Sequence, residues 1–289
     1  MKALLPSSLR GVARGSCHLI RQTFAEARFL RRLAWHVLIS GTGRTCPVCG
    51  HTCRLFKAIG SARRPDAECP GCGSRERHRF LWSYLQRRFA PQPAGAVLLH
   101  VAPEQFLEAP LRRLLPGWSC VSGDLSSRAA MVHFDLRQLP VPDRAVDLVI
   151  CSHVLEHIPE DFLAMREIAR VLSVAGVALI VVPMDNGATR EDLSIGDPAE
   201  RARRYGQEDH VRMYGDDFVV RLERAGLVVD QVFPGDVLAE SERRLYGVPC
   251  WVEPIFVCRR MTDDAASLPG RGHSLETGPT KLNLQHIGA

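Results

Sequence analysis

Two Cys-Pro-x-Cys-Gly segments carry the most specific chemistry in the sequence. Cys46 and Cys49 form the first pair, Cys69 and Cys72 form the second, and 19 residues separate the pairs. This spacing is typical of four thiolates that meet at a tetrahedral zinc ion, about 2.3 Å from each sulfur, with no coordination position left for a substrate. We therefore predict a structural Zn²⁺ site.

Two alternatives stay open for these cysteines. They could be free or redox-active thiols, and His51, Cys53 or His78 could replace one of them as a ligand. Nearby arginines would offset the negative formal charge of a zinc ion with four thiolates; they are Arg63, Arg64, Arg75, Arg77 and Arg79.

A second set of residues follows the ends of predicted strands. The apolar segment 96–102 predicts a strand that runs into a turn and a helix, and later strands are expected at 118–125, 146–154 and 177–183. In a doubly wound parallel sheet, ligands bind outside the carboxyl ends of the strands, and a carboxylate after the second strand accepts hydrogen bonds from a ribose. The polar residues near these ends are Asp124, Asp135, Ser152 and His153.

Strand-like and helix-like segments alternate from residue 96 onward. This alternation predicts an α/β fold, a Rossmann-like, doubly wound, mostly parallel sheet, preceded by an amphipathic helix and a small zinc-ribbon-like module. We divide the chain into a basic amphipathic N-terminal helix (1–45), a four-cysteine zinc module with the helix after it (46–90), the α/β domain (91–261) and a disordered tail (262–289).

Composition excludes several classes of protein. Of 289 residues, 46% are hydrophobic and 24% charged, which is typical of globular domains rather than collagen-like or disordered chains. The longest apolar run, Val177 to Val182, is too short to span a membrane. Because paired cysteines suggest a reducing compartment and the first residues lack an apolar secretory stretch, we expect a cytoplasmic protein.

Charge is distributed unevenly along the chain. Residues 1–90 contain 17 Lys and Arg against 4 Asp and Glu, whereas the remainder contains 20 against 28. The basic third could face nucleic acid, an anionic membrane or the chain's own acidic domain. Peripheral membrane contact through the amphipathic segment 18–39 is the less favoured option, since such helices more often pack on their own protein.

The longest motif lies at 135–159, DLRQLPVPDRAVDLVICSHVLEHIP, and is followed by MREIARVLSVAG at 165–176 and ALIVVP at 178–183. Over residues 94–259 the chain resembles the class I S-adenosylmethionine-dependent methyltransferases. It is similar to a type 11-like subgroup with HVAPE (100–104) in place of a glycine-rich turn, CPxCG modules in front and GQEDHVRMYG (206–215) behind.

The resemblance implies S-adenosylmethionine as cofactor. It assigns cofactor contacts to His100, Ala102, Glu104, Asp124, Asp135, Ser152 and His153. Family members usually carry an acidic residue and Gly-x-Gly in the first turn. Here Ala102 supplies the smallest side chain after glycine, and Glu104 is a candidate partner for the cofactor's ammonium group. A degenerate fold that no longer binds the cofactor is the alternative.

The catalytic candidate lies in the segment YGQEDHVRMYG (205–215). His210 is our candidate base, because an imidazole titrates near neutral pH; the alternative is a structural lid with a solvated histidine. His153 and His157 also have the spacing of a metal pair, but Glu156 is misplaced for a zincin motif, so we predict that Glu156 caps a short helix.

The predicted function is methyl transfer to a small-molecule acceptor. Two other functions stay open. One is a non-catalytic, zinc-stabilised protein that binds nucleic acid or another partner, and the other is an RNA methyltransferase. The acidic second part of the chain argues against a long polyanionic substrate.

Overall fold

The structure, a computed structural model, describes residues 41–60, 63–89 and 95–261. The predicted helix within 18–39, the tail 262–289 and nearly all of the Pro-rich segment 90–95 lie outside the described residues. No helix within the described ranges is both long and apolar enough to cross a membrane. The strands of the central sheet are β5 (Val97–Val101), β6 (Ser119–Asp124), β7 (Val132–His133), β8 (Val146–Ser152), β9 (Leu172–Val181), β12 (Leu227–Val232) and β13 (Ile255–Arg260).

Helices and short strands surround this sheet. The helices are α2 (Glu76–Phe89), α3 (Gln105–Leu114), the 3-10 helix η1 (Leu155–His157), α4 (Asp161–Val171), α5 (Pro198–Tyr205), α6 (Phe218–Arg224), α7 (Pro234–Val237) and α8 (Glu240–Tyr246). The short strands are β1 (Arg44–Thr45), β2 (Thr52–Cys53), β3 (Lys57–Ile59), β4 (Arg64–Glu68), β10 (Arg190–Glu191) and β11 (Arg212–Met213).

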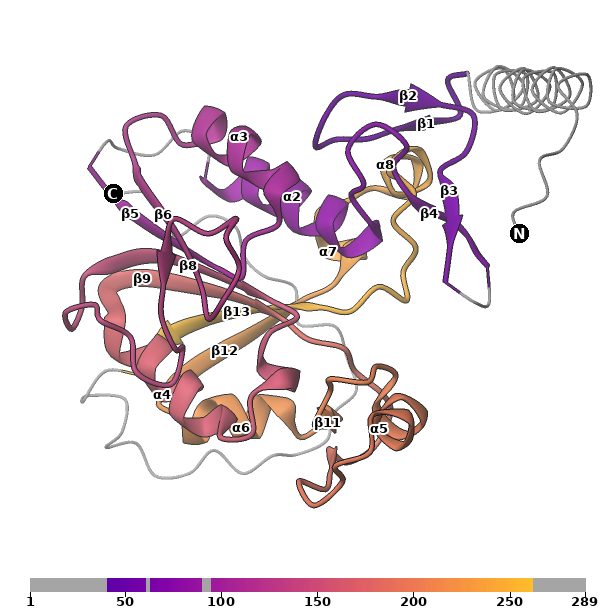
Figure 1. Cartoon of the computed structure of the whole chain (residues 1–289). Helices are drawn as coiled ribbons and strands as arrows, with labels where there is room; N and C mark the ends of the chain where they lie inside the picture. The colour runs from indigo at the N-terminus through magenta and orange to yellow at the C-terminus, as the bar shows by residue number, and fades with distance from the viewer. Residues whose placement is uncertain (1–40, 61–62, 90–94, 262–289) are drawn as a thin grey trace, which may run out of the picture.

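The strand order of the sheet is β12-β13-β9-β8-β5-β6-β7 (Figure 1). The five strands from β7 to β9 are parallel, and β13 runs antiparallel to both of its neighbours. The chain moves outward from β5 through β6 to β7 and then returns to β8, so the order reverses between β5 and β8. This reversal is the switch point of a doubly wound sheet. The predicted Rossmann-like fold is confirmed.

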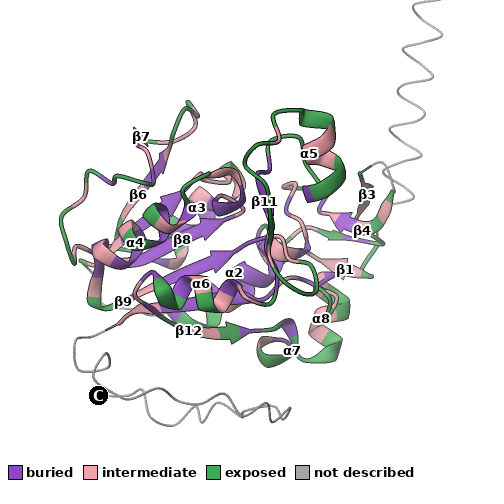
Figure 2. Ribbon diagram, turned by 90° about the horizontal axis from the view of Figure 1, so that it is seen from below, coloured by how far each residue is buried: buried purple, intermediate pink, exposed green. Residues whose placement is uncertain are grey.

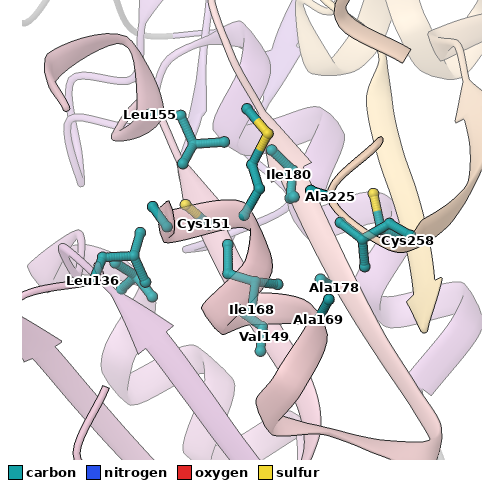
Figure 3. Packing of buried hydrophobic residues seen from close by; sticks show 14 of the residues in the cluster. Leu136, Val149, Cys151, Leu155, Ile168, Ala169, Ala178, Ile180, Ala225 and Cys258 are labelled. Carbon is teal, nitrogen blue, oxygen red and sulfur yellow. The ribbon is translucent and has the colours of Figure 1, made fainter. Parts of the chain in front are cut away.

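Helices cover both faces of the sheet, because the side chains of a strand alternate between the faces. Leu99 and Val101 point toward the face covered by α4 and α6, whereas Leu98 points toward α2 and α3. Figure 3 shows Ile168 of α4 beside Val149 of β8 in the first of these hydrophobic layers. Figure 2 shows the central strands buried, while α5 and α7 present exposed residues.

The cysteine module packs on the same face as α2 and α3. Val48 and Phe56 of the module belong to one continuous buried cluster that also contains Phe80 of α2 and Leu98 and Leu148 of the sheet. The module and the sheet therefore share a hydrophobic core.

The segment between β12 and β13, residues 233–254, packs against the module, and we call it the return segment. Its helix α8 lies beside β1 (Figure 1). The fully buried guanidinium of Arg79 donates to the carbonyl oxygens of Tyr246 (2.6 Å), Gly247 (2.8 Å), Ala67 (2.9 Å) and Ser74 (2.7 Å). One arginine of α2 thus joins the module to the return segment. This arginine belongs to the basic N-terminal third, and its hydrogen bonds are made within the protein.

Candidate cofactor and metal sites

The carboxyl ends of the central strands are aligned. Val101 of β5 is paired with Gly123 of β6 on one side and with Cys151 of β8 on the other. The residues that follow these three positions therefore emerge at one edge of the sheet. The structure brings Ala102, Glu104, Asp124, Ser152 and His153 to this edge, with His100 one residue before the end of β5 and Asp135 two residues after β7.

The two turns beside the switch point adopt a left-handed backbone. Ala102 after β5 has φ +47° and His153 after β8 has φ +54°, a region that few residues other than Gly, Asn, Asp and His enter. The N–H of Ala102 donates to the carbonyl of Gly123 (2.8 Å), and the N–H of His153 donates to that of Val181 (2.8 Å). Such conformations concentrate at ligand sites, where the surrounding hydrogen bonds hold the backbone in place.

Glu104 in the first turn is held by two histidines. Its carboxylate lies 2.9 Å from Nε2 of His100 and 3.5 Å from Nε2 of His78, which comes from α2. Burial opposes ionisation of Glu104, but the hydrogen bond from His100 and the neighbouring imidazoles outweigh it and hold the pKa at about 2. Burial lowers the pKa of His78 to about 3. We therefore describe Glu104 as ionised and His78 as neutral.

The part played by His78 did not emerge from the sequence. We had considered it only as a substitute zinc ligand, whereas its Nδ1 accepts the backbone N–H of Arg75 (3.1 Å) at the start of α2. That bond leaves the proton of the neutral ring on Nε2, toward Glu104. The contact spans 26 residues of sequence, so only the spacing of α2 and β5 in the fold reveals it.

The two aspartates of the predicted site make different local contacts. Oδ1 of Asp124 accepts the N–H groups of Ser126 (2.8 Å) and Ser127 (2.6 Å), so one oxygen fixes the turn after β6. Both oxygens of Asp135 accept hydrogen bonds from the guanidinium of Arg137, which holds the pKa of this carboxyl below its ordinary value.

The four predicted zinc ligands converge. The Sγ atoms of Cys46 and Cys72 are 3.7 Å apart, those of Cys49 and Cys69 are 3.8 Å apart, and all four lie within 4.8 Å of one another. A tetrahedron with bonds of about 2.3 Å has edges of about 3.8 Å, so the sulfur positions fit a zinc ion. His51, Cys53 and His78 are not part of this cluster.

The two cysteine turns have matching hydrogen bonds. The N–H of Gly50 donates to the carbonyl of Cys46 (2.8 Å), and the N–H of Gly73 donates to that of Cys69 (2.9 Å). Both glycines have positive φ, +75° and +81°, which explains the Gly after each pair. The hydroxyl of Ser74 lies 3.2 Å from the sulfurs of Cys46 and Cys72, where it can donate to a thiolate.

The segment 205–215 docks on the residues after β8. The fully buried guanidinium of Arg212 donates to the carbonyls of Leu155 (3.0 Å) and Pro159 (2.8 Å), and the N–H of Val211 donates to the carbonyl of Glu156 (2.9 Å). Arg212 is therefore a structural anchor of this segment.

This docking places His210 beside Glu156 and His157. The rings of His157 and His210 meet edge to face with centroids 4.7 Å apart, and the ligand atoms of all three residues lie within 4.8 Å of one another. His210 is 2% exposed, so the solvated histidine that we considered is wrong. Burial lowers its pKa.

Our prediction for Glu156 is also wrong. Glu156 lies inside η1, whose N-cap residue is Val154, and its carboxylate caps no backbone group. It is fully buried, and neither oxygen has a hydrogen-bond partner among the described residues. A helix cap is a local interaction, whereas the burial of Glu156 results from the docking of a segment more than 50 residues away.

Comparison with known proteins adds an independent observation. Residues 118–180, from just before β6 to β9, match the family model of a methyltransferase domain. Over this part of the sheet the chain is therefore similar to methyltransferases. The matched part contains Asp124, Asp135, Ser152 and His153.

Two relatives match parts of this chain. The 27-O-demethylrifamycin SV methyltransferase of Amycolatopsis mediterranei is 31% identical over 108 residues, 36% of this chain and 37% of that protein. The Mycobacterium tuberculosis protein named "Probable S-adenosylmethionine-dependent methyltransferase Rv3030" is 36% identical over 56 residues, 19% of this chain and 20% of its own. The chain thus spans about a third of the first relative and a fifth of the second.

One solved structure that the chain resembles weakly is that of geranyl diphosphate C-methyltransferase from Streptomyces coelicolor. It is 11% identical with a TM-score of 0.45, and the match covers 64% of this chain and 78% of that one.

Proposed function

We propose that this chain transfers a methyl group from S-adenosylmethionine to a small-molecule acceptor. The observation that carries the proposal is the alignment of β5, β6 and β8, which gathers the predicted cofactor residues at the switch point of a sheet that matches a methyltransferase family. The cofactor would supply an activated methyl group on a sulfonium sulfur.

We assign proposed contacts with the cofactor or the acceptor to residues at the carboxyl ends of the strands. Asp124 would accept the ribose hydroxyls through Oδ2, since the turn uses only Oδ1. Ala102 would let the ligand approach the backbone, Glu104 would accept the ammonium group, and Asp135 would face the adenine. Ser152 and His153 would line the side from which the acceptor enters.

Methyl transfer is an in-line displacement. The bond from sulfur to the methyl carbon breaks with its electron pair left on sulfur, while a lone pair of the acceptor forms the new bond to carbon. Positioning of the two reactants can lower the barrier of such a reaction by about 7 to 11 kcal/mol in favourable cases. A base is needed only where the acceptor also loses a proton, and His210 is our candidate for that role.

Two observations favour a small acceptor: the charge of the chain after residue 90 and the name of one relative. The part of the chain after residue 90 has an excess of acidic side chains, which repel a long polyanion. The named relative from Amycolatopsis acts, by its name, on a demethylated rifamycin, which is a small molecule. These two observations support a small acceptor rather than RNA.

Calorimetric titration with S-adenosylmethionine tests the proposal. Asp124→Asn keeps an oxygen for the turn and removes the carboxylate charge, so we expect the Kd to rise about 10- to 100-fold through the loss of charged hydrogen bonds. Asp143→Asn, at an exposed carboxylate that pairs with Arg170 elsewhere, is the control and should bind as wild type. Failure of the folded wild-type chain to bind the cofactor would overturn the proposal.

A further inference from the structure

Three side chains with metal-binding atoms meet where the segment 205–215 docks on η1. They are Glu156, His157 and His210, and the proposed cofactor contacts use none of them. Glu156 and His157 follow β8 in the sequence, and β8 ends at Ser152 beside the switch point. The cluster therefore lies on the side of the sheet edge where an acceptor would enter.

The buried carboxylate of Glu156 lacks compensation. It is 0% exposed, and neither of its oxygens has a hydrogen-bond partner in the part of the chain that the structure describes. The imidazole of His153 lies nearby, with its Nδ1 3.2 Å from Oε1, in a geometry that makes no hydrogen bond. A bound cation would compensate for the burial of a carboxylate that has no hydrogen-bond partner.

The two imidazoles are oriented as metal ligands are. Nδ1 of His210 donates to the carbonyl of Tyr205 (2.8 Å), and Nδ1 of His157 faces two oxygens of Asp209, each at 3.3 Å. A proton held on Nδ1 leaves a lone pair on Nε2, and metal-bound histidines generally have this second contact to an oxygen. Nε2 of His210 is buried and has no partner among the described residues.

We propose that Glu156, His157 and His210 bind a divalent first-row transition-metal ion such as Mn²⁺ or Zn²⁺. Two imidazoles and one carboxylate suit these ions better than Mg²⁺ or Ca²⁺, which prefer oxygen ligands alone. The ligand atoms of the three residues lie within 4.8 Å of one another. Three protein ligands leave coordination positions open, unlike the four thiolates of the cysteine cluster.

The open coordination positions would let the ion bind the acceptor. This role of the ion rests on the proposed function. An acceptor hydroxyl bound to the ion would release its proton to water more readily, and its oxygen would then attack the methyl carbon. Nε2 of His210 would be engaged by the metal in this arrangement, so the ion would replace His210 as the means of activating the acceptor. The proposal thus favours an acceptor with a metal-binding oxygen.

Titration of the zinc-loaded full chain with Mn²⁺, followed by the loss of the electron paramagnetic resonance signal of free Mn²⁺, tests the site directly. Mn²⁺ is the suitable probe because the four thiolates retain zinc and have little affinity for it. We expect one Mn²⁺ per chain and at least tenfold weaker binding in Glu156→Gln and in His157→Gln. His133→Gln, at an exposed histidine of β7, is the control and should bind Mn²⁺ as wild type.

Thermal unfolding gives a second measurement that does not depend on activity. Without Mn²⁺, Glu156→Gln should melt no lower than wild type, because neither oxygen of the carboxylate has a hydrogen bond to lose among the described residues. Added Mn²⁺ should raise the melting temperature of wild type alone. Equal Mn²⁺ binding by wild type and both variants, or no binding by wild type, would overturn the proposal. S-adenosylmethionine binding without Mn²⁺ binding would refute the metal site alone. Mn²⁺ binding without S-adenosylmethionine binding would refute the proposed function.

Discussion

His78 illustrates how a single buried side chain can connect two elements. It extends from α2 to Glu104 in the turn after β5, and it also packs against Phe106 with ring centroids 5.0 Å apart. Because the ring is buried, it is held in its neutral form, with a pKa lowered from the ordinary 6.5 to about 3. The unfolded chain therefore takes up a proton at His78 at a higher pH than the folded chain does.

This difference predicts a loss of stability on mild acidification. As the pH falls below 6.5, protonation of His78 favours the unfolded state, and between pH 7 and pH 5 this one group should cost about 2 kcal/mol. Urea unfolding of wild type and His78→Gln at both pH values measures the effect. The variant should lose correspondingly less stability over this interval.

The control for this measurement is His133→Gln, which changes an exposed histidine and should keep the wild-type dependence on pH. Glu104 contributes in a separate window, since its lowered pKa removes stability only as the pH falls from its ordinary value of 4.5 toward 2. Identical pH dependence in wild type and His78→Gln would contradict the assignment of a neutral, buried His78.

At the scale of elements, the return segment 233–254 holds the cysteine module against the sheet. Gly247 ends α8 with φ +58°, and a Cβ atom at this position would lie 2.8 Å from Cδ2 of Phe56. Glycine is thus required both by the backbone conformation and by the close approach of the module.

Gly247→Ala should therefore lower the free energy of unfolding by about 2 to 4 kcal/mol, through backbone strain and displacement of Phe56. Chemical denaturation measures this loss. Gly235→Ala is a matched control in α7 of the same segment, where a Cβ would meet nothing within 4 Å, and it should change the stability little. Equal effects of the two substitutions would show that the contact with Phe56 is unimportant.

At the scale of the whole molecule, the cysteine cluster and the sheet share one hydrophobic core. Cys46 and Cys69 are buried in the same cluster as Leu148 and Leu179 of the central strands. Loss of a metal from the four thiolates should consequently destabilise the complete fold and not the module alone.

Removal of zinc with a chelator should lower the melting temperature of the chain by more than about 10 °C within a single calorimetric transition. Cys49→Ser should have the same effect without a chelator. Cys250→Ser changes another exposed cysteine, outside the cluster, and should melt as wild type. Two separate transitions, with the sheet melting at an unchanged temperature, would mean that the module is independent of the sheet.

Sequence periodicity and spacing were sufficient to predict the features that depend on residues close together in the sequence. The alternation of strands and helices predicted the parallel sheet, because each element buries a face set by its own residues. The two CPxCG turns predicted a cluster of sulfur atoms, because each turn brings its own pair together. Asp124 could be placed at the edge of the sheet, because parallel strands end on the same side.

Only the tertiary structure decided the contacts between distant segments. The approach of His78 to Glu104, the bonds of Arg79 to the return segment and the meeting of His210 with Glu156 all join residues that no local pattern relates. Glu156 makes the difference clear, since its sequence context predicted a helix cap, whereas the docked segment buries it among histidines. The physical reason is that burial and charge depend on what packs against a side chain, and packing partners are selected by the whole fold.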